Sequence, residues 1–365
     1  MPSCPVPREK VRENPNSGRI EFLDGLRGVA IVMVVLFHAY ARWTDLLPFR
    51  DQFSGVAVFV NGWLGVQLFF MISGFVIVMT LGRCKSYFEF LLRRWFRLFP
   101  AMLVCSIIVF LTAPAFPERP AGTPSLRDLI PGLTFIDPVI WKKLFGGEQY
   151  VLEASFWSLF VEVQFYVIFG ALYFIAGRFL AIAGIFTIFL INCTGFLHGI
   201  PYLAKIGAQH YGWFTTGVLF YQYFSVRHRI WLYAAIFCGL ISAHSVTDFD
   251  VHGHYGITIT AFSVFAIFTG SFFWVSVREL LCARILVFMG FISYPLYLLH
   301  ENMMVSMIIK LGAWMPWMPA IALPVLPVLA VIALSWVIAS RVETKLRTAL
   351  QSSYKRCRQM IAANP

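Results

Sequence analysis

Charged residues are scarce in this sequence, and their scarcity excludes a water-soluble globular protein. Only 13% of the 365 residues are Asp, Glu, Lys or Arg, whereas 59% are hydrophobic. A soluble domain carries about 25% charged residues. A disordered chain is excluded as well, because such chains contain too few apolar residues to form a core. The composition therefore indicates that lipid surrounds most of this protein.

Cysteine is also scarce, and its positions form no pattern. Seven cysteines are dispersed at positions 4, 84, 105, 193, 238, 282 and 357, without a CxxC pair. An odd, dispersed set favours free thiols over a disulfide framework or a cysteine-based zinc site. We therefore expect no bound metal.

Long hydrophobic runs are what the sequence has in abundance. A helix that crosses a membrane needs about 20 apolar residues. We predict an all-α polytopic bundle of about ten spans, over residues 27–44, 56–80, 97–113, 154–176, 179–197, 211–226, 230–246, 255–277, 285–310 and 320–340. The first run resembles a signal peptide, but its polar entry at Asp24 and Arg27 and the nine later runs favour a retained helix.

The chain is basic, with a formal net charge of +11. Most Lys and Arg residues lie in the segments that share a side with the N-terminus, so the positive-inside rule predicts that both termini are cytoplasmic. Topology thus explains the basic surplus without a nucleic acid partner. We predict a cytoplasmic tail at 1–19, a membrane-embedded domain at 20–340 and a basic cytoplasmic tail at 341–365, all at the cell inner membrane.

The longest stretch outside the predicted spans is residues 114–153, which contains six prolines. This composition predicts a lid or a re-entrant loop, and it is too short for an independent catalytic domain. Any chemistry must therefore take place in the membrane bundle itself.

Ionisable side chains occur in the first predicted span. Each costs ~2.5–3.5 kcal/mol near the middle of a bilayer and therefore needs an explanation. Arg27 and His38 are eleven residues apart, which predicts one shared helix face and about 16 Å between them along the axis. Asp24 can pair with Arg27 at i,i+3 spacing. The alternative is a structural pair: an arginine at the membrane edge and a buried histidine bonded to a carbonyl.

Two later spans carry polar stripes at helical spacing. Their members are Ser158, Glu162 and Tyr166 in one span, and Ser293, Tyr297 and His300 in the other. A carboxylate at this depth favours a functional role for Glu162, whereas His300 fits a structural histidine equally well. Pro295 lies within the second stripe and is expected to loosen its helix.

Polar groups also mark the second span and the segment after it. Gln67 and Ser73 can form hydrogen bonds between helices, while the neighbouring glycines favour close packing. The segment after the span contains Arg93, Arg94 and Arg97 among aromatic residues. This pattern is typical of an interfacial helix held by anionic lipids, and equally of a clamp for a phosphorylated ligand.

Five sequence blocks, in order, resemble the signature of acyltransferase family 3, which comprises bacterial integral-membrane O-acyltransferases of surface and secreted glycans. The first block joins Leu23-Asp24-Gly-Leu26-Arg27-Gly to His38 through an Arg-x10-His spacing. The other blocks cover residues 65–75, 93–100, 157–166 and 293–300.

The resemblance implies a ten-helix bundle that uses a cytosolic acyl-CoA, most often acetyl-CoA, as co-substrate and keeps no permanent cofactor. The implied acceptor is a hydroxyl of a polysaccharide or glycolipid, such as an O-antigen, a lipopolysaccharide or an exopolysaccharide. By this resemblance the family's essential and basic residues correspond to Arg27, His38, Arg93, Arg94, Arg97 and Glu162. The sequence departs from the family at Glu301-Asn302, where many members have an aromatic residue and Pro, and at Gln67, where an acidic residue is common.

We therefore predict that His38 is the general base, because burial disfavours its charged form. Glu162 would orient its ring, as the carboxylate does in a catalytic triad. Arg27 would assist at the cytoplasmic mouth, and the basic loop would bind the phosphates of CoA. Further polar lining is expected from Asp24, Gln67, Ser73, Ser158, Tyr297 and His300. An acyl-His38 intermediate is an alternative to direct transfer.

Other classes of function remain open at this point. A proton-coupled transporter or exporter would also bury His and Glu, although it predicts paired broken helices or repeats, and the sequence shows no repeat. A catalytically silent partner of a polysaccharide-export complex is a second alternative. O-acylation of a small glycosylated metabolite is a third.

Overall fold

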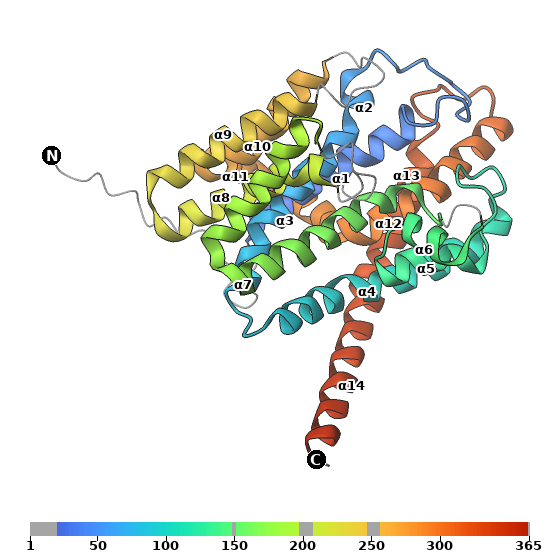
Figure 1. Cartoon of the computed structure of the whole chain (residues 1–365). Coiled ribbons are helices and arrows are strands. Elements are labelled where there is room, and N and C mark those ends of the chain that lie inside the picture. The colour runs from blue at the N-terminus through green and yellow to red at the C-terminus, as the bar shows by residue number, and fades with distance from the viewer. Residues whose placement is uncertain (1–19, 148–150, 197–206, 247–255, 364–365) are drawn as a thin grey trace.

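The computed structural model describes residues 20–147, 151–196, 207–246 and 256–363, which fold into an all-α bundle (Figure 1). The predicted fold class is thus confirmed, while the tail predicted for residues 1–19 lies outside the described residues. The helices are α1 (Glu21–Tyr40), α2 (Ala57–Val60), α3 (Gly65–Leu81), α4 (Tyr87–Thr112), α5 (Leu129–Thr134), α6 (Pro138–Phe145), α7 (Trp157–Cys193), α8 (Tyr211–Val226), α9 (Arg229–Ser245), α10 (Ile257–Phe273), α11 (Val275–Leu281), α12 (Arg284–Trp314), α13 (Val325–Val337) and α14 (Thr344–Ala363).

Each of the ten predicted spans overlaps one of these helices or one half of a kinked helix. By length and composition, five helices among the described residues can cross a membrane, and the pair α10–α11, bent by 107°, is a possible sixth. Several of the others, such as α8 with 16 residues, are shorter than the usual span of about 20. The count of ten and the orientation of the termini therefore stay predictions.

Helix α7 contains a break that joins two predicted spans into one element. Residues 154–176 and 179–197 were expected as separate helices, and residue 197 lies outside the described part of the chain. At Gly177 the backbone turns to φ 84° and ψ 169° before the helix resumes. Glycine permits this conformation, because a Cβ atom would clash with the backbone there.

Helices α1 and α12 form the tightest packing in the centre of the bundle. A Cβ atom on Gly290 of α12 would overlap the backbone carbonyl of Asp24 in α1. In the same way, a Cβ on Gly25 would overlap the carbonyl of Leu281, next to the start of α12. Glycine thus lets two backbones touch, as is typical of helices that pack in membranes. The contact brings polar residues further along both helices within reach of each other.

A second glycine contact joins α3 to α8. A Cβ atom on Gly74 would overlap the carbonyl oxygen of Phe214, and one on Gly217 would overlap that of Met71. The interpretation of the glycines in the second span as packing residues is therefore confirmed at Gly74. This contact places α3, with its polar residues Gln67 and Ser73, between α1 and α8.

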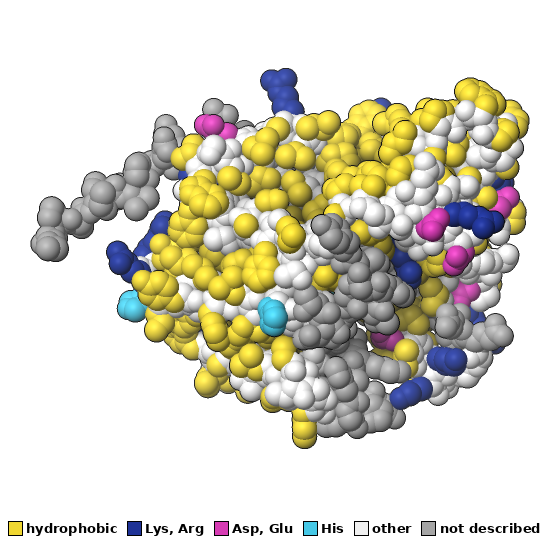
Figure 2. All heavy atoms as spheres, turned by 90° about the horizontal axis from the view of Figure 1, so that it is seen from above, with side chains coloured by type: hydrophobic (Ala, Val, Ile, Leu, Met, Phe, Trp, Pro, Cys, Tyr) yellow, Lys and Arg dark blue, Asp and Glu magenta, His cyan; other side chains and the backbone are white. Residues whose placement is uncertain are grey.

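The outer surface of the bundle is largely apolar. Figure 2 shows hydrophobic side chains over most of the visible face, with the charged side chains mainly toward its rim. On α9 and α10, large apolar side chains are more than half exposed, among them Ile230, Phe237 and Ile259. Such a surface is unfavourable in water and favourable in lipid. The chain is thus built as a polytopic membrane protein.

The proline-rich stretch predicted as a lid or re-entrant loop is folded and docked on α12. We call residues 113–147 and 151–153 the cap segment; it contains α5 and α6. Arg119 donates a 2.5 Å hydrogen bond to the carbonyl of Leu152, and the backbone N–H of Ala121 donates to Asn302 Oδ1 at 3.0 Å. The cap segment is therefore held against the middle of α12, where His300 lies.

The C-terminal helices form one long rod. Helix α13 continues through the π-helical turn Ile338–Glu343 into α14, which projects away from the bundle (Figure 1). The predicted domain boundary at residue 340 lies within this continuous helix. Tyr354 contacts the ring of Phe96 in α4, with centroids 5.8 Å apart, and so connects α14 to the bundle.

Candidate active site

Two buried histidines, one from α1 and one from α12, contact each other inside the bundle. His38 Nδ1 and His300 Nε2 are 3.1 Å apart, and their rings meet edge to face with centroids 4.5 Å apart. The side chain of His300 is fully buried, and His38 is 8% exposed. The sequence singled out both residues but not their contact, because it depends on the packing of α1 against α12.

Backbone carbonyls determine which nitrogen of each ring carries the proton. His38 Nδ1 lies 2.9 Å from the carbonyl oxygen of Val34, and His300 Nδ1 lies 2.9 Å from that of Tyr297. A carbonyl oxygen only accepts hydrogen bonds, so each neutral ring is protonated on Nδ1. His300 Nε2 then accepts a hydrogen bond from the Nδ1–H of His38. This N–H is shared between two acceptors, His300 Nε2 and the carbonyl oxygen of Val34. The lone pair of His38 is therefore on Nε2.

A carboxyl group faces this basic nitrogen. Glu301 Oε1 lies 3.6 Å from His38 Nε2, within ion-pair distance once the imidazole gains a proton. Glu301 Oε2 accepts a 2.6 Å hydrogen bond from the backbone N–H of Ser155, which holds the carboxyl group in place. The sequence marked Glu301 only as a departure from the family pattern. Its position directly after His300 in an apolar helix was the signal that could have identified it. We call His38, His300 and Glu301 the histidine cluster.

A second buried carboxyl group, Glu153, lies behind Glu301. Glu153 Oε2 accepts a 3.1 Å hydrogen bond from the backbone N–H of Asn302. The side-chain amide of Asn302 donates a second hydrogen bond, 2.9 Å long, to the carbonyl oxygen of Leu152. Burial, reinforced by the charge of Glu301, raises the pKa of Glu153 well above its usual range. Burial likewise lowers the pKa of Arg119, against the attraction of Glu153. Sequence reasoning missed Glu153, although it directly precedes a predicted span.

A second polar site, which we call the arginine pocket, lies between α1, α3, α4, α7 and α12. Its cavity has a volume of about 90 Å³. Its polar lining consists of Arg27, Ser73, Arg94, Arg97, Ser158, Glu162, Tyr166, Ser293, Tyr294 and Tyr297. Arg27 forms a 2.7 Å ion pair with Asp24, which confirms the pair predicted from i,i+3 spacing. The pocket therefore combines three guanidinium groups with a set of hydroxyl groups.

Glu162 belongs to the arginine pocket, and this corrects its predicted pairing with His38. Glu162 accepts hydrogen bonds from the hydroxyls of Ser73 and Tyr166. In the described part of the chain, the carboxyl group beside His38 is that of Glu301. Helical spacing identifies which residues share a face of α7, but not which helix that face meets. This is why the sequence could not predict which carboxyl group lies beside His38.

Arg94 is held at the wall of the pocket by two groups. Its Nη2 donates a 3.1 Å hydrogen bond to Thr80 Oγ1, and its guanidinium lies over the ring of Tyr166 at 4.8 Å from the centroid. Arg94 is only 8% exposed, whereas the next arginine back along the chain, Arg93, is exposed and pairs with Glu89 at 2.7 Å. The basic loop thus divides into Arg94 and Arg97, which line the pocket, and Arg93, which faces outward.

Ser158 and Tyr297 connect the two polar sites. The hydroxyl of Tyr297 donates a 2.7 Å hydrogen bond to the carbonyl of Ser155. Because that phenol has only one proton, Ser158 Oγ is the donor in the 2.6 Å bond between the two hydroxyls. The carbonyl of Tyr297 holds His300, and its side chain lines the arginine pocket. Two residues predicted as polar lining therefore occupy the space between the sites.

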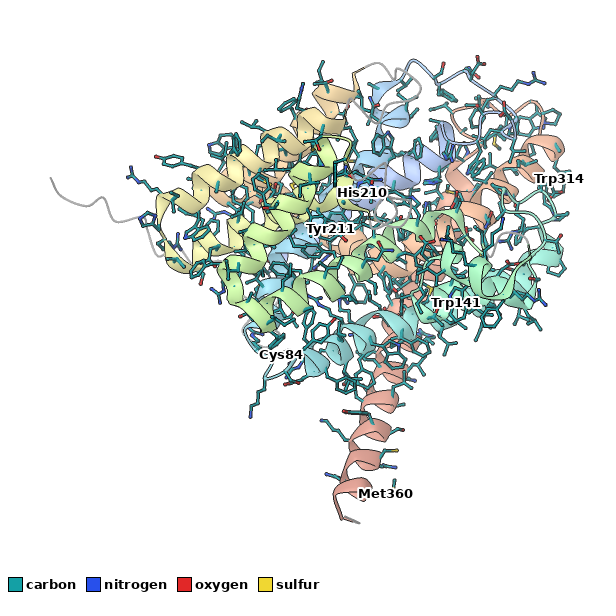
Figure 3. All side chains as sticks on the ribbon, viewed as in Figure 1. Cys84, Trp141, His210, Tyr211, Trp314 and Met360 are labelled. Carbon is teal, nitrogen blue, oxygen red and sulfur yellow. The ribbon has the colours of Figure 1, made fainter. Side chains whose placement is uncertain are left out.

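Gln67, which was predicted as polar lining, has a partner outside both polar sites. Gln67 Nε2 lies 3.3 Å from Nδ1 of His210, a half-buried histidine that the sequence did not single out. Figure 3 shows His210 next to Tyr211 at the start of α8, inside the bundle. Ser293 lines the arginine pocket, and its hydroxyl donates at 2.8 Å to the carbonyl of Gly290. Gln67 thus contributes to packing between α3 and α8 and not to either polar site.

The site combines a buried histidine beside a carboxyl group with a neighbouring pocket that contains arginines. Such an arrangement suits group transfer from a phosphorylated donor. Comparison with known families identifies the class of enzyme. The profile of the family described as acyltransferase domain matches residues 20–340. This chain belongs to acyltransferase family 3. The family predicted from the five sequence blocks is thereby confirmed. The match includes both the histidine cluster and the arginine pocket.

Individual relatives are more distant. Over 161 residues, or 40% of this chain, it is 30% identical to the O-acetyltransferase OatA of Staphylococcus aureus strain NCTC 8325 / PS 47. OatA of S. aureus strain MRSA252 matches with the same identity and coverage. The aligned part is 23% of the length of OatA, so this chain corresponds to about a quarter of that relative. No solved structure matches the chain.

Proposed function

We propose that this protein is a membrane O-acyltransferase that moves an acyl group, acetyl foremost, from cytosolic acyl-CoA to a hydroxyl of a polysaccharide or glycolipid. Family membership and the similarity to O-acetyltransferases support the reaction class. The observation that carries the proposal is the position of His38 Nε2, which lies 3.6 Å from a fixed carboxyl group in a buried site.

His38 acts as the general base in this reaction. Its Nε2 takes the proton of the acceptor hydroxyl while the hydroxyl oxygen attacks the carbonyl carbon of the thioester. The tetrahedral intermediate then collapses, the C–S bond breaks, and the CoA thiolate takes the proton from the imidazolium. The proton of the hydroxyl thus ends on the thiol of CoA. A positioned base of this kind contributes about 10²–10⁴-fold to the rate.

Glu301 and His300 prepare His38 for this role. The charge of Glu301, 3.6 Å from Nε2, stabilises the imidazolium that forms when this nitrogen takes up the proton. In this assignment Glu301 replaces Glu162, and it acts from the side of the basic nitrogen, whereas a triad carboxylate acts from the opposite nitrogen. His300 accepts the Nδ1–H of His38 and so keeps the ring in one tautomer. Both groups act through His38, and we therefore describe them as positioning residues.

The arginine pocket is the proposed donor site. Guanidinium groups match phosphate oxygens in geometry as well as in charge. The cavity of about 90 Å³ equals the liquid volume of only about three water molecules. It therefore suits the thioester end of acyl-CoA, while the nucleotide end stays near the exposed Arg93 and Arg97. Glu162 supports this site by holding Tyr166, on which Arg94 is stacked.

The proposed topology gives the reaction a direction. We place ten spans and both termini as the sequence predicts, with cytoplasmic tails at 1–19 and 341–365 around the membrane domain of 20–340, in the cell inner membrane. Arg27, near the start of α1, then lies toward the cytoplasm. His38, on the last turn of α1, lies toward the opposite side, where the acceptor is presented.

Replacement of the base tests this proposal. Full-length purified protein receives acetyl-CoA together with lipid and polysaccharide fractions from a strain that lacks the gene, and release of CoA is measured. We expect His38→Ala to reduce release by at least about 100-fold, because the base is lost. The exposed His244 offers a matched control, and His244→Ala should retain activity. Near-full turnover by His38→Ala, in a protein that folds normally, would remove His38 from catalysis.

A further inference from the structure

A large chamber lies between the cap segment and the start of α7. It consists of two adjoining cavities of about 840 and 750 Å³, which share Asp128, Lys142, Val151 and Ala154 in their walls. Each is within the size range of small-molecule sites, about 300–1,000 Å³. We call the cavity of about 840 Å³ the apolar lobe and the other the polar lobe, after the side chains described below.

Residues in the inner wall of the chamber, or next to it, form hydrogen bonds with the histidine cluster and with its neighbour Asn302. Glu153 lines the apolar lobe and accepts the hydrogen bond of the Asn302 backbone, next to Glu301. Ala154, in the wall of both lobes, is followed by Ser155, whose N–H holds the carboxyl group of Glu301. The chamber therefore shares part of its wall with the residues that hold the carboxyl group of Glu301 in place.

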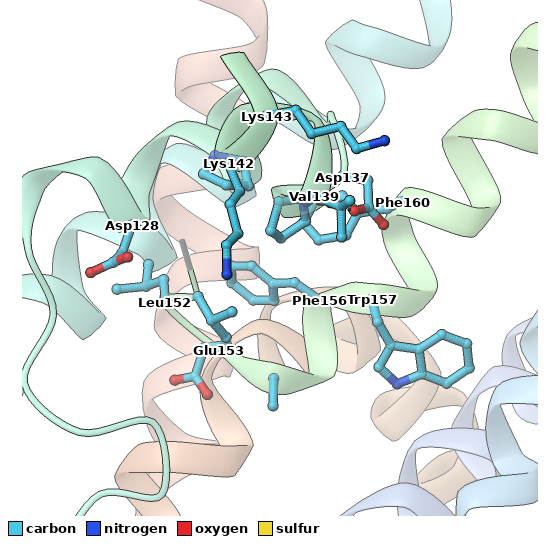
Figure 4. A pocket seen from close by; sticks show the side chains of 15 residues that line it. Asp128, Asp137, Val139, Lys142, Lys143, Leu152, Glu153, Phe156, Trp157 and Phe160 are labelled. Carbon is cyan, nitrogen blue, oxygen red and sulfur yellow. Dashed lines mark hydrogen bonds between the residues drawn. The ribbon is translucent and has the colours of Figure 1, made fainter. Parts of the chain in front are cut away.

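The two lobes differ in chemistry. The apolar lobe is formed mainly by hydrophobic side chains: Pro131, Val139, Leu152, Phe156, Trp157 and Phe160. The polar lobe is lined by hydroxyl and charged groups, among them Thr123, Ser125, Arg127 and Asp128. Charged residues also reach the apolar lobe: Asp128, Asp137, Lys143 and Glu153. Lys142 lies in the wall of both, and Figure 4 shows its side chain extending toward Leu152 and Phe156. A cation thus stands where an apolar space meets a polar one.

Helix α6, which covers the apolar lobe, has the character of an interfacial helix. Leu144 and Phe145 are 66% and 65% exposed, and Ile140 is nearly half exposed. Lys142 lies on the same two-turn helix. Large exposed apolar side chains beside a lysine are typical of helices that lie at the surface of a bilayer. The apolar lobe therefore lies next to the lipid surface, from which a hydrocarbon chain can enter it.

From these observations we propose that the chamber is the acceptor site and that the acceptor is a lipid-linked glycan. Its hydrocarbon occupies the apolar lobe, its sugar occupies the polar lobe, and the phosphate between them pairs with Lys142. This inference rests on the proposed function, which it narrows from polysaccharides and glycolipids in general to a membrane-anchored acceptor with an anionic linkage.

Binding of a simple amphiphile tests the chamber independently of catalysis. Tritiated farnesyl phosphate is titrated onto the full-length protein in phosphatidylcholine nanodiscs, with empty nanodiscs as background. Farnesol and inorganic phosphate, each of which lacks one half of the proposed ligand, are the comparison probes. We expect saturable binding of farnesyl phosphate, and markedly weaker binding of the other two. Equal binding of farnesol would overturn the role of the cation, and with it the proposal.

Two variants with matched controls locate the binding. Lys142→Ala removes the ammonium and should weaken farnesyl phosphate binding by about tenfold or more, as is usual for a lost charge-assisted hydrogen bond. Val139→Trp fills the apolar lobe and should weaken farnesyl phosphate binding by excluding the hydrocarbon chain. Lys355→Ala on the exposed α14, and Ile140→Trp on the outer side of α6, should bind as the wild type does. Wild-type binding by both Lys142→Ala and Val139→Trp would refute the chamber as the site.

Two further measurements distinguish the proposed acceptor site from a site for ordinary phospholipid and from a failure of the proposed function. Replacing phosphatidylcholine by phosphatidylglycerol should leave farnesyl phosphate bound, whereas its displacement would show a site for ordinary phospholipid and contradict an acceptor role. Release of CoA by the wild type is measured in parallel. If CoA is released normally while the chamber variants bind and turn over as the wild type does, the acceptor site is wrong and the proposed function stands. If CoA is never released, the proposed function fails.

Discussion

Replacement of Glu301 by glutamine is the sharpest test of the reassigned carboxylate. The change removes the negative charge beside His38 Nε2 but keeps the size of the side chain, and the amide oxygen can still accept the hydrogen bond from Ser155. We expect turnover to fall while the KM for acetyl-CoA stays unchanged, because the arginine pocket is left intact. Glu301→Asp, which keeps the charge on a shorter side chain, should recover part of the loss.

The distance between the two groups gives the size of the expected effect. Coulomb's law for unit charges 3.6 Å apart gives about 4.6 kcal/mol at an effective dielectric constant of about 20. Proton transfer is only partly complete in the transition state, so about half of this energy is lost with the charge. At 1.36 kcal/mol for each factor of ten, a loss of about 2.3 kcal/mol lowers kcat by about 50-fold.

Release of CoA by the purified full-length variant, with the acceptor fractions described above, measures this effect. The exposed Glu279 on α11 provides the matched control, and Glu279→Gln should turn over as the wild type does. A Glu301→Gln protein with unchanged kcat would refute the role of Glu301. A variant that loses turnover because KM for acetyl-CoA rises, with kcat retained, would assign Glu301 to donor binding instead.

Three further predictions concern other parts of the structure. Arg94→Glu should raise the KM for acetyl-CoA by about tenfold, because it puts a negative charge in the wall of the proposed donor site and so repels the anionic donor, whereas Arg229→Glu on the exposed start of α9 should not. The raised pKa of Glu153 means that the folded state binds more protons than the unfolded state, so stability falls as pH rises above the ordinary carboxyl range. Glu153→Gln should therefore flatten the decline in melting temperature between about pH 5 and pH 8; a decline equal to that of the wild type would contradict this. Gly290→Leu should separate α1 from α12 and lower the melting temperature, whereas Gly55→Leu, which meets open space, should not; an unchanged melting temperature for Gly290→Leu would refute the close packing.

Much of the helical arrangement could be predicted from the sequence, because hydropathy and helical spacing are local properties. The pair of Asp24 with Arg27 and the bond between Glu162 and Tyr166 both follow from positions one turn apart. The break at Gly177 was visible as the gap between two predicted spans. Whether each helix crosses the bilayer is a separate question, since it depends on depth and tilt in the lipid, and neither is encoded in a local pattern.

The composition of the candidate site could not be predicted to the same extent. His38 and His300 meet only because glycines such as Gly290 let α1 and α12 approach closely, and glycine in a membrane helix has several other uses. Glu162 was assigned because it is a carboxylate deep in a predicted span and because the family resemblance marks it, whereas Glu301 was noted only as a departure from the family pattern. Glu153 was missed because the groups that act on it, Arg119, Glu301 and Asn302, are distant from it in sequence.

The helix α1 explains why the two polar sites need a connection. Arg27 and His38 are about 16 Å apart along its axis, so the donor phosphates and the base cannot occupy one small cavity. Tyr297 fills the space between them: its ring faces the arginine pocket, and its carbonyl fixes the tautomer of His300. A thioester that enters the pocket must therefore pass the hydroxyls of Tyr297 and Ser158 to reach His38. In the proposed mechanism, movement of Tyr297 to admit the donor would also alter the support of His300, so donor entry and activation of the acceptor hydroxyl would depend on the same residue.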